Sequence, residues 1–276
     1  MKPMTPPQPD AAAPPAAEAA VNVWTPAPCL GQFSFERERV RALWNELHAA
    51  ECLPCPTNDA LLDGWALFHT GLFERAKDAG ALAGMAGAPL ACRASACHAA
   101  LVEASLPARV QHLQNLHMRA CTYAAFTPRC PETWFWQGWA LMQYTTIIGA
   151  AAALAQGLVM PTMTALRTAL MLGERHAWAH ATLGELEAEV IGALGAFTAH
   201  MSHGIRQAEA LDSLHTALRL APNSPAVLCT SARALRCLGS AHLDEARALL
   251  ERAATHTPLD ASEWLWGEHA RALLAR

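Results

Sequence analysis

Charged residues are scarce in this chain. They make up 16% of its 276 residues, whereas about a quarter is typical of soluble domains. The 24 Asp and Glu residues outnumber the 20 Lys and Arg residues, which gives a formal net charge of −4. Because the basic side chains are scattered and form no run that could neutralise phosphates, we expect no nucleic-acid partner.

Common signatures of nucleotide binding and covalent catalysis are also missing. The sequence contains no Gly-x-Gly-x-x-Gly fingerprint, no Walker-type loop and no Gly-x-Ser-x-Gly elbow. No nucleophile with an adjacent base stands out either. We therefore expect a protein that is not an enzyme and that carries no cofactor or metal ion.

The N-terminal residues lack the continuous apolar stretch of a secretory signal peptide. Proline and alanine dominate them, which predicts a disordered tail over residues 1–30. Nine cysteines at irregular spacings indicate free thiols in a reducing compartment better than a disulfide framework. These features together favour a cytoplasmic protein.

Alanine and leucine are what the chain has in abundance, with only two tyrosines. That bias favours helix over sheet and predicts an all-α fold. Apolar residues at helical spacing, interrupted by prolines and glycines, predict the elements of an N-terminal helical region, residues 31–130. The expected segments are helices over 35–51, 58–72, 90–105 and 107–125, with a glycine-rich loop over 80–89.

A repeat is visible in the C-terminal half. Two small-residue and leucine patterns, each closed by a proline, are displaced by 36 residues: Ala210, Leu214, Ala217 and Pro222 correspond to Ala246, Leu250, Ala253 and Pro258. A period in this range predicts stacked helix pairs, because a single pair cannot bury its apolar faces alone.

The region 131–276 carries the residues of a known repeat. Leu183 and Gly184 stand where a Leu-Gly pair is needed, and Trp134 and Gly138 occupy the aromatic and small positions of the preceding unit. Trp264 takes the aromatic position of a final half unit. The pattern resembles the tetratricopeptide repeat (TPR) family, and in particular uncharacterised bacterial proteins of that type. Gln137 and Glu187 depart from the pattern, and an insertion lies near 192–204.

The resemblance implies an α-α superhelix of antiparallel helix pairs that binds a protein or peptide in a concave groove lined by the first helix of each pair. By that analogy the groove residues are Glu132, Phe135, Trp139 and Met142, then Trp178, Ala181 and Glu185, then Cys229, Arg233 and Arg236. Aromatic residues at helical spacing are equally typical of a packed core.

Some polar residues have spacings that also occur in metal or redox sites. Cys52 and Cys55 form a Cys-x-x-Cys pair, but no second pair exists and no strand precedes them, so free thiols are expected. His176 and His180 lack the Glu of a zincin motif and are assigned to helix capping and packing. Two further sets are expected on solvated surfaces: His200 with His203, and Glu185, Glu187 and Glu189.

Residues 133–166 contain no charged side chain. The part from 134 to 160 is long enough to span a bilayer, although its glutamines and threonines dilute the apolarity and disfavour a membrane helix. A helix enclosed by its neighbours is apolar all round as well. A third interpretation is that 134–160 lines a cavity, which would indicate a small-ligand carrier or transport accessory instead of a scaffold.

Overall fold

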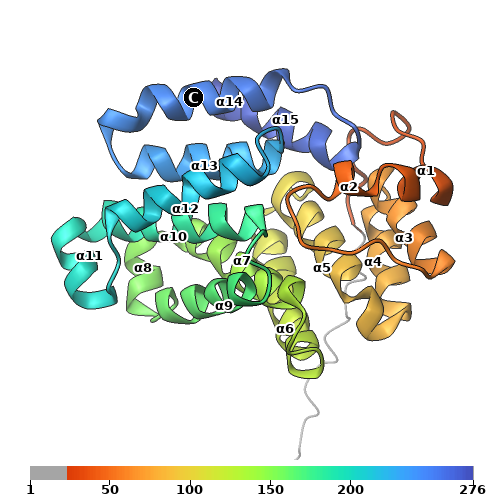
Figure 1. The fold of residues 1–276 in the computed structure, drawn as a ribbon, viewed down its shortest axis with the longest axis horizontal. Coiled ribbons are helices and arrows are strands. Elements are labelled where there is room, and N and C mark those ends of the chain that lie inside the picture. The colour runs from red at the N-terminus through yellow and green to blue at the C-terminus, as the bar shows by residue number, and fades with distance from the viewer. Residues whose placement is uncertain (1–23, 276) are drawn as a thin grey trace, which may run out of the picture.

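The computed structural model describes residues 24–275, and the regular structure in this part of the chain is entirely helical (Figure 1). The prediction of an all-α protein is confirmed. Its α-helices are α1 (Arg37–Ala42), α2 (Trp44–Leu47), α3 (Asp59–His69), α4 (Phe73–Leu82), α5 (Ala88–Cys97), α6 (Leu106–Phe126), α7 (Pro131–Ile148), α8 (Ala150–Ala155), α9 (Val159–Leu172), α10 (Ala177–Leu194), α11 (Ala196–His203), α12 (Gln207–Leu220), α13 (Pro225–Cys237), α14 (Leu243–Thr255) and α15 (Ala261–Leu274). Short turns are η1 (Gly84–Gly87), the π-helical η2 (His98–Val102) and η3 (Ser240–His242).

From α7 onward the helices stack as pairs. α7 packs against α9, α10 against α12, and α13 against α14, with α15 following as an unpaired last helix (Figure 1). The first helices of successive pairs also touch, because α10 packs on α13 and α13 on α15. The interior between these layers is one large apolar core.

Glycines allow the paired helices to approach closely. A Cβ atom on Gly138 would lie 2.7 Å from the Leu166 side chain, and one on Gly184 would lie 2.7 Å from Leu214. Distances under 3.0 Å are not tolerated without a shift of the neighbour. The expectation that these two positions must be small therefore has a direct steric cause.

Three expected segments differ in detail. The single helix over 35–51 is broken at Leu43 into α1 and α2, although the predicted apolar face with Val40 and Trp44 is still buried. The glycine-rich stretch 80–89 is mostly helical, because Gly80 and Gly87 lack side chains and let α4 and α5 meet backbone to backbone. The insertion near 192–204 forms α11.

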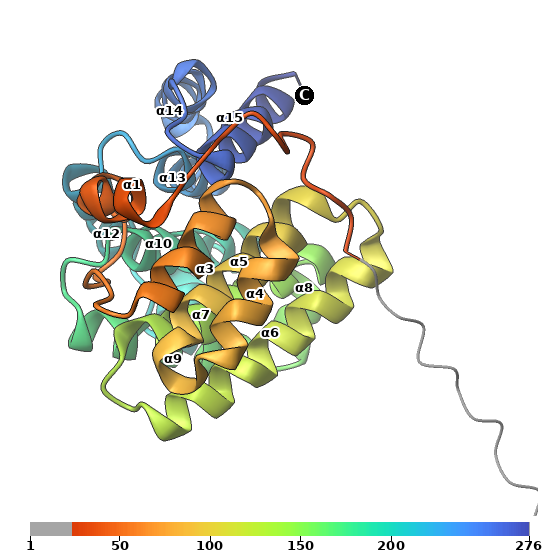
Figure 2. The ribbon, with the colours of Figure 1, turned by 90° about the vertical axis from the view of Figure 1, so that its right-hand side faces the viewer.

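The N-terminal and C-terminal parts of the described chain pack against each other. α3 contacts α15, and both views place them on the same side of the molecule (Figures 1 and 2). Most of the predicted tail lies outside the described residues, but its end, residues 24–30, packs here: the Cys29 thiol donates to the Ala261 carbonyl at 3.8 Å. This second apolar cluster joins α1, α3, α4 and α15.

Within residues 24–275 no helix combines the length and the apolarity that crossing a membrane requires. The uncharged segment 134–160 forms α7, α8 and the start of α9. Trp136 and Trp139 on α7 are fully enclosed by neighbouring helices.

Candidate functional site

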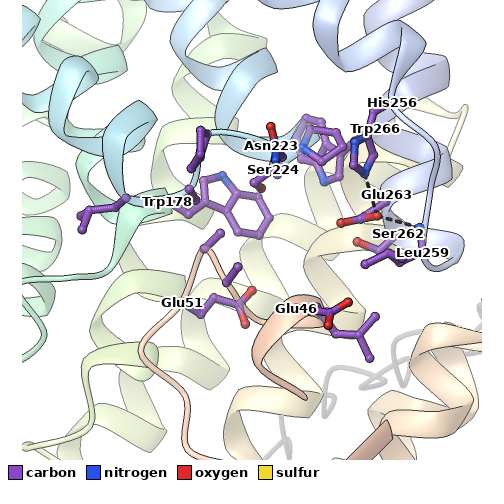
Figure 3. Close-up of a pocket in the computed structure, with 18 of the residues that line it drawn as sticks. Glu46, Glu51, Trp178, Asn223, Ser224, His256, Leu259, Ser262, Glu263 and Trp266 are labelled. Atoms are coloured by element: carbon purple, nitrogen blue, oxygen red, sulfur yellow. Dashed lines mark hydrogen bonds and ion pairs between the residues drawn. The ribbon is translucent and has the colours of Figure 1, made fainter. Parts of the chain in front are cut away.

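A cavity of about 340 Å³ lies where α2 meets the N-terminal ends of α10, α13 and α15 (Figure 3). Its volume is within the range of small-molecule and side-chain binding pockets. The lining includes two tryptophans, three carboxylates and several polar turn residues: Trp178, Trp266, Glu46, Glu51, Glu263, Arg93, His256, Asn223, Ser224 and Ser262.

Helix capping places three helix starts at this cavity. The His176 Nδ1 atom accepts from the Ala179 amide at 3.1 Å and begins α10. Ser224 caps α13 and is followed by Pro225, whose missing amide hydrogen costs nothing at a first helical position. Asp260 caps α15 by accepting from the Glu263 amide at 2.8 Å. The expected capping role of His176 is confirmed.

Trp178 and Trp266 form the apolar wall. Their rings meet edge to face with centroids 5.8 Å apart, a favourable aromatic arrangement. Both belong to first helices of the array, and each is almost completely buried. In Figure 3, Trp178 lies at the centre of the view, above Glu46 and Glu51, with Trp266 to its upper right.

Carboxylates surround the opposite side. Glu46 is exposed at the rim, and Glu263 accepts from the Leu259 amide at 2.7 Å and contacts His256 Nε2 at 3.1 Å. Burial raises the pKa of Glu263, and the neighbouring charge of Asp260 adds to the rise. Among the described residues of the lining, Arg93 is the only lysine or arginine, so the cavity has an acidic character.

A buried polar network supports the floor of the cavity. Glu51 receives Arg93 Nη1 at 2.8 Å and lies 2.9 Å from His48 Nδ1. Burial raises the pKa of Glu51 while Arg93 opposes the rise, and burial together with Arg93 holds the pKa of His48 well below its ordinary value. The imidazole of His48 thus contacts both the guanidinium and the carboxylate, which also contact each other. These contacts with Arg93 of α5 hold the segment that follows α2 in place.

The same segment is anchored to the repeat helices by its backbone. The Trp178 amide donates to the Ala50 carbonyl at 3.0 Å, which attaches residues 49–51 to the start of α10. Cys52 lies beside the turn before α10, with its thiol 3.9 Å from the Gly173 carbonyl. Burial raises the pKa of the Cys52 thiol, which disfavours a reactive thiolate, and Cys55 is exposed. Neither is in a disulfide.

The structure brings one of the predicted groove aromatics to the cavity and places the others in the core. Trp178 lines the cavity, whereas Phe135, Trp139 and Met142 are fully buried against neighbouring helices. Glu132 is also buried, 3.2 Å from His176 Nε2. These four side chains of α7 offer no surface to a partner in this conformation.

The remaining predicted groove residues lie on α10 and α13, away from the cavity. Glu185 is buried and pairs with Arg233, whose Nε is 2.7 Å from the carboxylate. Ala181 and Cys229 are buried as well. Arg236 is exposed near the end of α13, beside a small hollow next to α14 and α15.

The expectation of a solvated face on α10 is wrong for two of its three carboxylates. Glu185 and Glu187 are 1% and 2% exposed. Arginines from neighbouring helices compensate them, Arg233 for the first and Arg167 for the second. Residues 185 and 187 could be recognised as buried only from the packing of α9, α12 and α13 around α10.

Several cavity residues have no signal in the sequence. Trp266 lies in the cavity, whereas the pattern pointed to Trp264 two residues earlier. Glu51 and Arg93 are far apart in the sequence and meet only in the fold. The sequence gives one hint, the recurrence of proline-bearing turns. Pro222 lines the cavity, and Pro258 lies between two residues that line it.

Comparison with known proteins gives a match in structure only. No protein-family model and no curated protein sequence matches the chain. A crystal structure of a thermophilic TPR protein from Thermus thermophilus superposes with a TM-score of 0.51 at 18% sequence identity, covering 77% of this chain and 97% of that chain. Similarity at this level of identity concerns the fold. The chain therefore has a tetratricopeptide-like fold, an α-α superhelix of packed helix pairs.

Proposed function

We propose that the protein is a non-catalytic scaffold that binds a segment of another protein, with one basic side chain of that segment inserted in the cavity beside Trp178. The observation that carries the proposal is the combination of two tryptophans with three carboxylates, of which Glu46 is exposed at the rim, in a pocket of about 340 Å³. Tetratricopeptide-like folds generally serve protein interaction, which is an analogy of fold and supports the class of function alone.

The chemistry of the lining fits a lysine or arginine anchor. The aliphatic stem of such a side chain packs on indole rings, and its charge is attracted both by ring faces and by carboxylates. Glu46 at the rim is exposed and available for this contact. An acidic anchor would meet Glu46 and Glu263 at close range and would be repelled.

A peptide display selection tests the proposal directly. Ala49 is exposed and lines the cavity, so Ala49→Trp places a bulky side chain there, and Ala42→Trp, at an exposed position of α1, is the matched control. We expect peptides selected on the wild-type protein to contain a basic residue flanked by apolar ones. Their affinity should fall at least tenfold with Ala49→Trp and remain unchanged with Ala42→Trp.

Two outcomes would contradict the scaffold. Selected peptides that bind Ala49→Trp as well as wild type, or that share an acidic anchor, would place binding elsewhere or reverse its charge preference. A small-molecule carrier is the second candidate, because a cavity of this volume also suits a metabolite. Native mass spectrometry of protein purified from its own cells would favour the carrier if it showed one retained small molecule and no partner protein.

The alternative cavity along the uncharged segment has less support. The cavity beside α2 does not involve residues 134–160. A second hollow touches that segment only at Thr145, Thr146, Gly149 and Ala150, and Glu189 and Cys237 help to complete it. A third hollow beside α8 borders the segment as well, but its volume is only about 10 Å³. Most other side chains of α7 are buried or half-buried against neighbouring helices.

A further inference from the structure

Two histidines and a glutamate converge at the junction of α5, η2 and α6, on residues that take no part in the cavity. His98 begins the π-helical turn, and the Glu103 amide donates to the His98 carbonyl at 2.9 Å, which keeps both residues within one turn. His112 approaches from α6. One potential ligand atom of each of the three side chains lies within 4.8 Å of the other two.

All three side chains are buried, and both ring nitrogens of His98 and one of His112 have no hydrogen-bond partner among the described residues. His98 is 1% exposed. The Thr25 backbone lies near its ring, but neither ring nitrogen makes a hydrogen bond of normal geometry among the described residues. The Nε2 atom of His112 has none either, and it lies 3.7 Å from Glu103 Oε2. Burying polar atoms without partners costs free energy, and a ligand bound among these three side chains would satisfy them.

The donor set is that of a transition-metal site. Imidazole nitrogens bind metal ions in their neutral form, and both histidines present a ring nitrogen to the cluster. Two imidazoles with one carboxylate are typical of zinc sites that keep one position for water.

The surroundings orient these groups. Trp24 stacks on His98 with ring centroids 4.2 Å apart and covers one side of the cluster. Glu103 Oε1 accepts from the Ser105 amide at 2.7 Å, which leaves Oε2 for a ligand. The positive charge of Lys77 is near His112 and disfavours a bound cation. Lys77 is itself paired with Asp78 at 2.8 Å, which partly compensates that charge.

We propose that His98, Glu103 and His112 bind one zinc ion, with water as the fourth ligand. Tetrahedral zinc at about 2.0–2.2 Å holds its ligand atoms about 3.4 Å apart. His112 Nε2 and Glu103 Oε2 are already 3.7 Å apart, and the candidate ligand atoms lie within 4.8 Å of one another, so the side chains must close by at most about 1.4 Å. The bound ion joins the end of α5 to α6 beneath Trp24. This site is independent of the proposed partner binding.

Titration of the metal-free full chain with Zn²⁺ in competition with a chromophoric chelator tests the proposal. We expect one high-affinity site per chain and a rise in melting temperature with zinc. Glu103→Gln and His112→Gln should each weaken binding at least tenfold. His215→Gln, whose side chain is 58% exposed, is the matched control and should bind zinc as the wild type does.

X-ray absorption of the zinc-loaded wild type provides a measurement that does not depend on folded variants. We expect only nitrogen and oxygen ligands, with the signature of two imidazoles. Sulfur among the zinc ligands would show that the ion binds at cysteines instead and would overturn the proposal. Unchanged affinity in Glu103→Gln and His112→Gln, or no site tighter than that of an exposed histidine, would overturn it equally.

Discussion

Two carboxylates on α10 are buried beside arginines of different helices. Glu185 pairs with Arg233 of α13, and Glu187 lies 3.3 Å from Arg167 of α9. Burial raises the pKa of Glu187 to about 7 because the partial charge compensation from Arg167 does not offset desolvation. A carboxyl group whose pKa is raised on folding destabilises the folded state as it ionises.

Replacing Glu187 should therefore have an effect that depends on pH. The wild type loses stability as pH rises from the ordinary pKa of 4.5 through about 7, and Glu187→Gln, which stays neutral, does not. We expect the free energy of unfolding of Glu187→Gln, taken relative to that of the wild type, to be about 2 kcal/mol larger at pH 8 than at pH 5. Urea unfolding at both pH values measures it.

An exposed carboxyl group serves as the control for that experiment. Glu245→Gln, whose side chain is 44% exposed, should change by less than about 0.5 kcal/mol between the same pH values. An equal pH effect in both variants would show that Glu187 is solvated.

For single residues, the sequence predicted which helix a side chain belongs to better than it predicted what surrounds that side chain. The resemblance to the tetratricopeptide repeat implied that Phe135, Trp139 and Trp178 lie on the groove-lining faces of first helices. It could not distinguish a face covered by α6 and α9 from one that borders a cavity, because the covering helices are remote in sequence. The same limit concealed Glu51 and Trp266.

The paired helices depend on small residues at their crossings. A Cβ atom on Gly184 would lie 2.7 Å and 2.8 Å from two Leu214 carbons and 3.1 Å from the Ala210 carbonyl oxygen. Gly267 on α15 has its nearest neighbours at 3.5 Å and 3.7 Å, which is ordinary contact. The two glycines therefore form a matched pair with opposite expected responses to alanine.

Gly184→Ala should destabilise the protein by about 2 kcal/mol, because α10 and α12 must separate to admit the methyl group. Gly267→Ala should be neutral or stabilising by up to about 1 kcal/mol, since alanine is the better helix former. Chemical denaturation of the two variants compares them. A smaller loss for Gly184 than for Gly267 would contradict the close-approach explanation.

The elements after Pro131 were predictable because their motif residues act locally: prolines and caps begin the helices and glycines mark the crossings. Before Pro131 prediction was poorer. The glycine-rich stretch 80–89 resembles a loop by composition, yet Gly80 and Gly87 serve a backbone contact between α4 and α5. Composition alone does not separate glycines that bend the chain from glycines that let helices touch.

At the scale of the whole molecule, a buried histidine–aspartate pair joins the last helix to the N-terminal region. His69 Nδ1 on α3 donates to Asp260 Oδ2 at the start of α15, 2.6 Å away, and both side chains are almost fully buried. Burial alone would raise the pKa of Asp260, but the hydrogen bond from His69 lowers it below the ordinary value. The carboxylate is therefore ionised, and it accepts hydrogen bonds from His69 and from the Glu263 amide.

Removing the His69–Asp260 hydrogen bond should lower the free energy of unfolding far more than removing an ordinary helix cap. Asp260→Ala leaves His69 and the Glu263 amide without their partner, and we expect a loss of about 3–5 kcal/mol. Ser224→Ala removes the corresponding cap of α13, which has no such remote partner among the described residues, and should cost about 1 kcal/mol. Equal losses in urea unfolding would show that the link to α3 contributes nothing.

An open helical solenoid can lengthen by duplication, because each new helix pair needs only the neighbour on which it stacks. Here α15 must reach α3. An extra pair inserted between α10 and α15 would carry Asp260 away from His69 and leave both polar groups buried and unpaired. The contact between α15 and α3 therefore disfavours the insertion of a further helix pair and sets the number of pairs that this chain can accommodate.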